Sequence, residues 1–102
     1  MSEYLQKFSP DFPDISAEIW IDEVGGVITA QSYLVGHGHG DLLLELAQQA
    51  IQEYTTQKQV NVTHELLPSN KSAVQLVLRA GGYIYAGKTA TNLPIFTKTF
   101  YP

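Results

Sequence analysis

Hydrophobic and polar positions alternate or recur along most of the chain, and their spacing predicts its elements. In residues 17–23, Ile19 and Ile21 alternate with Glu18, Trp20 and Asp22, which predicts a strand with one buried face. A Gly-Gly pair at 25–26 is a turn signal, and the β-branched segment 27–35 follows it. These two segments are therefore expected to form a β-hairpin.

Two later segments have helical spacing. From Asp41 to about residue 57, leucines, alanines and Ile51 recur at three- and four-residue steps, which is typical of an amphipathic helix. Asp41 suits its first turn or its N-cap. A second helix is expected from a Ser69 or Asn70 cap to about residue 80, ended by two glycines. Its expected inward positions are Ala73, Val74, Val77 and Leu78.

The remaining segments predict three more strands. Segment 59–67 places His64 on an apolar face with three aliphatic residues and Glu65 on the opposite face. Segments 83–88 and 94–100 predict two last strands, the second opened by a proline. Residues 1–16 are expected to form a loose arm. The prediction is one domain over 1–102 of the α/β (α+β) class, in the order β-β-α-β-α-β-β, with helices packed on a mixed sheet.

Composition narrows the function classes. The 102 residues are 44% hydrophobic and 16% charged, with net charge -4 and six scattered basic residues, so no nucleic-acid partner is expected. Without cysteine there is no thiolate nucleophile or thiolate metal site. The absence of a signal pattern or long apolar run favours a cytoplasmic protein with no membrane partner. A short domain buries a smaller share of its surface than a larger one does, so we expect a homodimer.

Two stretches carry a family pattern. One is the strand, glycine loop and leucine-rich helix around VGHGHGDLLLEL, and the other is ELLPSNKSAVQLVLRAGGY. Together, from 17 to 87, they resemble the acetyl-CoA-binding half of the GNAT acetyltransferase superfamily, whose loop reads Gln/Arg-x-x-Gly-x-Gly/Ala. The six loop positions fall on 35–40. Asn70, Ala73 and Gly81 occupy the second motif, and Tyr83 comes close to its aromatic position.

The resemblance implies a GNAT-like mixed sheet that binds acetyl-CoA or a related acyl-CoA, with N-acetyltransfer to an unknown amine. Glycines let the backbone approach a pyrophosphate, and unpaired N–H groups at a helix start attract anions. The strand before the glycine loop and strand 60–66 would hold the acyl-pantetheine. The implied catalytic residues are Glu65 and Tyr83. The implied cofactor-binding residues are Val35, Gly36, His37, Gly38, His39, Gly40, Asp41 and Asn70.

Three positions depart from the family pattern. Val35 replaces the Gln/Arg anchor, Asp41 adds a negative charge where a pyrophosphate would lie, and Val77 falls near the usual tyrosine acid. Like charges about 4 Å apart repel by roughly 1 kcal/mol in water. These departures leave open an alternative of a different class, a non-catalytic dimeric interaction module that keeps a GNAT-like fold without the chemistry.

The HGHGD stretch also invites a metal interpretation. His37, His39 and Asp41 match the start of the His-x-His-x-Asp-His motif of metallo-β-lactamase-like hydrolases, but Leu42 stands at the closing histidine. A simpler zinc site with both histidines and one carboxylate stays an alternative. The favoured interpretation has both histidines as solvated loop residues, and no metal is expected. His64 is expected to be a hydrogen-bonded core histidine.

Overall fold

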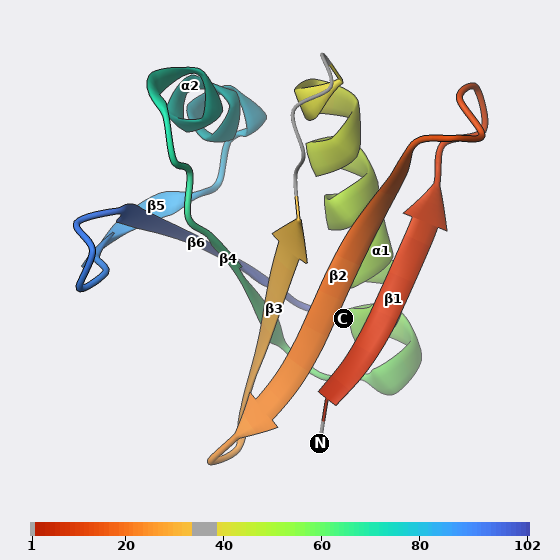
Figure 1. Cartoon of the computed structure of the whole chain (residues 1–102). Coiled ribbons are helices and arrows are strands. Elements are labelled where there is room, and N and C mark those ends of the chain that lie inside the picture. The colour runs from red at the N-terminus through yellow and green to blue at the C-terminus, as the bar shows by residue number, and fades with distance from the viewer. Residues whose placement is uncertain (1, 34–38) are drawn as a thin grey trace.

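A mixed sheet with two helices on one face forms the body of the protein (Figure 1). The computed structural model describes residues 2–33 and 39–102. In these ranges the elements are β1 (Ser2–Phe8), β2 (Ser16–Val24), β3 (Val27–Tyr33), α1 (Gly40–Lys58), β4 (Val62–Leu66), α2 (Lys71–Ala80), β5 (Ile84–Lys88) and β6 (Pro94–Phe100). The prediction of a mixed α and β fold is confirmed. Neither described helix is long and apolar enough to cross a membrane.

The strand order is β1-β2-β3-β4-β6-β5, and only the β3–β4 pair is parallel. A parallel pair requires a crossover connection, and α1 lies on that connection. The paired positions run from Thr29 opposite Thr63 to Gln31 opposite Glu65. Although β3 and β4 both continue past these positions, their pairing stops there. The sheet therefore divides at its centre, between β3 and β4 (Figure 1).

The core lies between the sheet and the helices in two clusters. The larger cluster joins inward residues of β2, such as Ile19, to Ala47 and Ile51 of α1. The smaller cluster joins Leu44 of α1 to Val77 of α2, and its other members are Leu66, Tyr83 and Phe96. Burying each large side chain stabilises the fold by about 1.5–3 kcal/mol. The predicted alternation of β2 and the helical period of α1 are thus confirmed.

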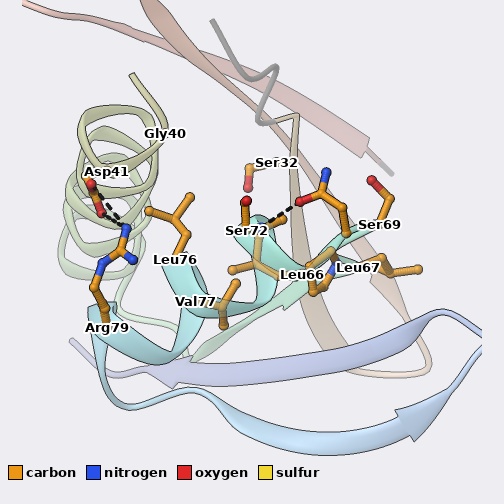
Figure 2. Close-up of a pocket in the computed structure, with 13 residues that line it drawn as sticks. Ser32, Gly40, Asp41, Leu66, Leu67, Ser69, Ser72, Leu76, Val77 and Arg79 are labelled. Carbon is orange, nitrogen blue, oxygen red and sulfur yellow. Dashed lines mark hydrogen bonds and ion pairs between the residues drawn. The ribbon is translucent and has the colours of Figure 1, made fainter. Parts of the chain in front are cut away.

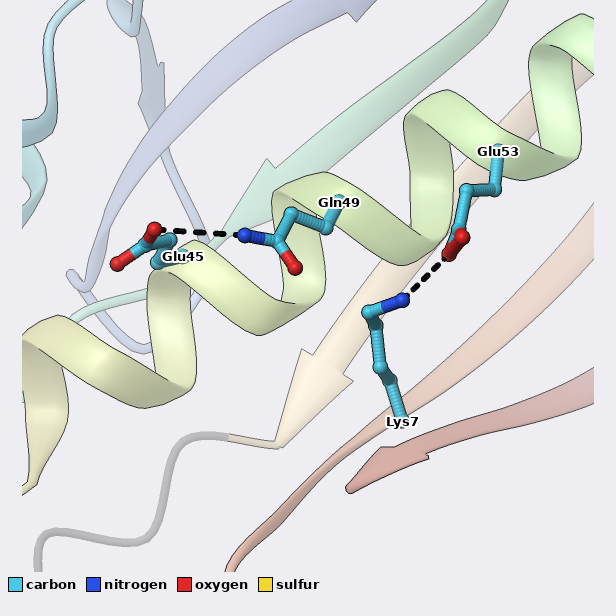
Figure 3. A network of polar contacts seen from close by, with 4 residues as sticks. All are labelled: Lys7, Glu45, Gln49 and Glu53. Carbon is cyan, nitrogen blue, oxygen red and sulfur yellow. Dashed lines mark hydrogen bonds and ion pairs between the residues drawn. The ribbon is translucent and has the colours of Figure 1, made fainter. Parts of the chain in front are cut away.

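The expectation of a loose arm over 1–16 is wrong, because Ser2–Phe8 form the edge strand β1. This strand pairs with β2 along its whole length, and Leu5 packs against the larger cluster. The Lys7 ammonium lies 2.7 Å from the Glu53 carboxylate of α1 (Figure 3). The sequence does not predict this strand because β1 buries little apolar surface and shows almost no hydrophobic alternation. Its hydrogen bonds to β2 hold it in the extended conformation.

Helix α2 begins and ends where the sequence predicts, but one inward position is wrong. Leu78 is 59% exposed, whereas Leu76 packs against the smaller cluster together with Val74. The apolar stripe of α2 is wide enough to fit two orientations. The packing of α2 against α1 selects the one that turns Leu76 inward.

Candidate ligand-binding site

A cavity of about 560 Å³ opens where β3 and β4 separate (Figure 2). It is lined by Ser32 of β3, by the first residues of α1, by the last residue of β4 and the segment 67–70 after it, and by one side of α2. This volume lies within the range of small-molecule pockets in proteins. The lining comes from two separate parts of the chain, Ser32 with Gly40 and Asp41, and residues 66–79, so the cavity exists only in the folded protein.

Both helices present their N-terminal ends to this cavity. Gly40 and Asp41 begin α1, and Asn70 caps α2 by accepting a hydrogen bond from the Ala73 backbone N–H at 2.8 Å. The predicted Asn70 cap is confirmed. Helix starts carry unpaired N–H groups and the positive end of the helix dipole. The cavity is therefore favourable to a ligand with negative or electron-rich groups.

Asp41 does not stand alone at the cavity edge. Arg79, near the end of α2, places one guanidinium nitrogen 3.2 and 3.4 Å from the two Asp41 carboxylate oxygens (Figure 2). Both side chains are exposed, so the pair stabilises the fold by at most about 1 kcal/mol. Arg79 was missed from the sequence, because 38 residues separate it from Asp41 and only helix packing brings them together.

Gly40 has a packing reason of its own. A Cβ atom at this position would lie 2.9 Å from a methyl group of Leu76, so a larger residue here would require the Leu76 side chain to move. His39 precedes it as the N-cap residue, and its ring lies 5.1 Å from the Phe12 ring. The predicted cofactor residues Val35, Gly36, His37 and Gly38 lie outside the described residues.

A buried polar chain leads away from the cavity. Ser32 Oγ lies 2.7 Å from His64 Nε2, and His64 Nδ1 lies 2.6 Å from the Tyr83 hydroxyl. His64 is fully buried, and its pKa is lowered to about 4 by desolvation and by nearby Lys98. Burial raises the pKa of Tyr83. The expected hydrogen-bonded core histidine is confirmed. Its two hydrogen-bond partners, the hydroxyl groups of Ser32 and Tyr83, are both neutral near pH 7.

The two predicted catalytic residues do not come together. Tyr83 reaches His64 on the face of the sheet that the helices cover. Glu65 follows His64 in β4 and therefore points to the opposite face, between Gln31 and Thr97 of the neighbouring strands. Neither residue lines the cavity. Val77, the position near the family's tyrosine, is buried and gives the cavity an apolar wall.

In the ranges 2–33 and 39–102, no three His, Asp or Glu side chains gather as a metal site would require. The alternative zinc site needs His37, which lies outside those ranges, and so it stays a hypothesis. No family model, curated protein or solved structure matches this chain.

Proposed function

We propose that this chain is a small GNAT-like protein that binds acetyl-CoA or a related acyl-CoA between β3 and β4. One observation carries the proposal. The central parallel strands stop pairing at Gln31 and Glu65, and a cavity of about 560 Å³ opens there between two helix N-termini. Strand edges that separate expose backbone N–H and C=O groups. Such groups can hold the amides of an acyl-pantetheine arm.

The strand order supports the same proposal. One parallel pair stands between an antiparallel meander and a final antiparallel pair, and a mixed sheet is what the resemblance of the two sequence motifs implies. The glycine loop connects β3 to α1. The pyrophosphate would therefore lie near the start of α1, where N–H groups favour anions.

The charges near the cavity are compatible with a phosphate-bearing ligand, although the sequence suggested an uncompensated negative charge at Asp41. Asp41 would repel a phosphate, but the Arg79 guanidinium contacts its carboxylate and offsets that charge. Arg79 also lines the cavity. Since guanidinium groups bind phosphates well, Arg79 takes the role of cationic anchor that Val35 cannot supply.

Acetyl transfer to an amine is the reaction that the resemblance implies, with Glu65 as base and Tyr83 as acid. The separation of these residues on opposite sheet faces gives transfer less support than binding. We therefore propose acyl-CoA binding as the primary function and N-acetyltransfer as its extension.

Thermal unfolding with and without acetyl-CoA tests the binding function. A ligand that binds only the folded state raises the unfolding midpoint, by several degrees for a domain of this size at saturation. Ala73 lines the cavity and Gln75 is exposed on the same helix. Ala73→Phe should remove the shift, whereas Gln75→Phe should keep it. No shift in the parent protein at millimolar acetyl-CoA would exclude binding.

A second candidate is the dimeric interaction module without catalysis. The edge strand β5 favours this candidate. It pairs with β6 on one side, and its Ile84 and Tyr85 side chains are 69% and 57% exposed. Apolar side chains on a free sheet edge are typical of strand pairing between subunits. A dimer that persists without any acyl-CoA binding would favour this candidate.

A further inference from the structure

We infer that Ser32 is a hydrogen-bond donor in the cavity, that buried His64 and Tyr83 fix this role, and that it binds a carbonyl oxygen of the acyl-pantetheine. The inference rests on the proposed acyl-CoA function. It assigns a ligand-binding role to a residue outside the six glycine-loop positions 35–40.

The position of one hydrogen decides whether Ser32 donates or accepts. His64 is fully buried, and its strand neighbour on β6 is Lys98, whose ammonium lies 5.5 Å from the centre of the Tyr83 ring. Burial and a nearby cation both disfavour an imidazolium. His64 therefore carries one ring hydrogen, either on Nδ1 or on Nε2.

The two tautomers give opposite results at Ser32. With the hydrogen on Nδ1, the ring donates to the Tyr83 oxygen, and the Tyr83 hydrogen needs another acceptor. Among the described residues, His64 is the only hydrogen-bond partner of that hydroxyl. With the hydrogen on Nε2, Tyr83 donates to Nδ1 and His64 donates to Ser32 Oγ. The second arrangement pairs both buried donors, those of Tyr83 and His64, and leaves over only the hydroxyl hydrogen of Ser32, which lines the cavity, so it is favoured.

In this arrangement the Ser32 hydroxyl hydrogen is left for the cavity. Ser32 Oγ already accepts from His64, and Ser32 lines the cavity (Figure 2). A fixed neutral donor suits an uncharged acceptor, and Leu76 and Val77 add apolar surface to the same cavity. The carbonyl oxygens of an acyl-pantetheine, in its amides and its thioester, are acceptors of this kind.

Titration calorimetry of the whole protein tests the inference. Ser32→Ala should bind acetyl-CoA about five- to tenfold more weakly, the loss of one neutral hydrogen bond. Ser32→Cys keeps a side chain of similar size but with a weaker hydrogen-bond donor. Its affinity for acetyl-CoA should lie between those of the parent and Ser32→Ala. Ser2 is exposed on β1 and does not line the cavity, so Ser2→Ala should bind like the parent.

Two further ligands separate a specific effect from general damage. Adenosine 3′,5′-bisphosphate lacks the pantetheine, so Ser32→Ala should bind it like the parent. CoA without the acetyl group shows which carbonyl is bound: a loss for CoA as well indicates a pantetheine amide, and a loss for acetyl-CoA alone indicates the thioester. Equal weakening for the bisphosphate, or no weakening for acetyl-CoA, would overturn the inference.

The tautomer is measured independently of any ligand. Long-range ¹H–¹⁵N spectra at neutral pH should place the His64 hydrogen on Nε2, and a hydrogen on Nδ1 would overturn the donor assignment. If the parent protein binds no acetyl-CoA, the proposed function fails and the inference fails with it. If the parent binds and Ser32→Ala binds equally well, only the inference fails.

Discussion

His64 Nδ1 lies 2.6 Å from the hydroxyl oxygen of Tyr83, and both side chains are buried. This contact satisfies a ring nitrogen that burial would otherwise leave without a partner. It also links the start of β5 to the centre of the sheet, and through Ser32 to the wall of the cavity. Stability and the proposed ligand binding would therefore share this polar chain.

Acid should weaken the fold through His64. Its pKa is lowered from 6.5 to about 4 in the folded protein, so between these values the unfolded chain binds more protons. Above pH 6.5 the His64 ring is neutral in both states and costs no stability. As the pH falls towards 4, the free energy of unfolding should decrease by up to about 3 kcal/mol. Urea unfolding from pH 7.5 to 4 measures this decrease. The His64→Gln variant should show a flatter dependence, and an equal dependence would contradict the assignment.

Removal of the Tyr83 hydroxyl should destabilise the protein. Tyr83→Phe leaves the His64 Nδ1 atom buried without a donor, which costs about 1–3 kcal/mol. Tyr85 provides the matched control, because its side chain is 57% exposed and Tyr85→Phe should change the free energy of unfolding by less than about 0.5 kcal/mol. Chemical denaturation of both variants is the measurement. Equal stability of the two would show that the Tyr83–His64 contact contributes nothing.

The ion pair at the cavity edge should have opposite effects through its two members. Asp41→Asn removes a negative charge near the phosphates and should tighten acetyl-CoA binding about two- to fivefold. Arg79→Ala removes the positive charge and should weaken it by a similar factor. Both effects should shrink at high salt. Titrations at 50 and 500 mM salt measure them, and changes of the same sign in both variants would contradict this electrostatic account.

The β5 edge should control self-association. Ile84→Lys places a charge on the exposed edge strand and should shift a dimer towards monomers. Leu78 is an exposed apolar residue on α2, so Leu78→Lys controls for the loss of apolar surface in general and should leave the dimer intact. Light scattering over a concentration series measures both. A parent protein that stays monomeric at every concentration would exclude the homodimer.

The sequence predicted most elements but only part of the candidate site. The alternation in β2, the helical period of α1 and the Asn70 cap are local patterns, and each appears in the structure. By contrast, β1 depends on pairing with β2, and the orientation of α2 depends on its contact with α1. Features that depend on distant contacts leave little pattern in the sequence, because each residue involved is compatible with several environments.

The sequence by itself determined the class of the fold and the place of its turns, since hydrophobic period and glycine conformation act within a few residues. It also placed His64 in the core. Only the tertiary structure decided that Arg79 meets Asp41 and that Ser32 and Tyr83 meet at His64. These contacts join residues 19 to 38 positions apart. Their formation depends on how strands and helices pack, which no local pattern encodes.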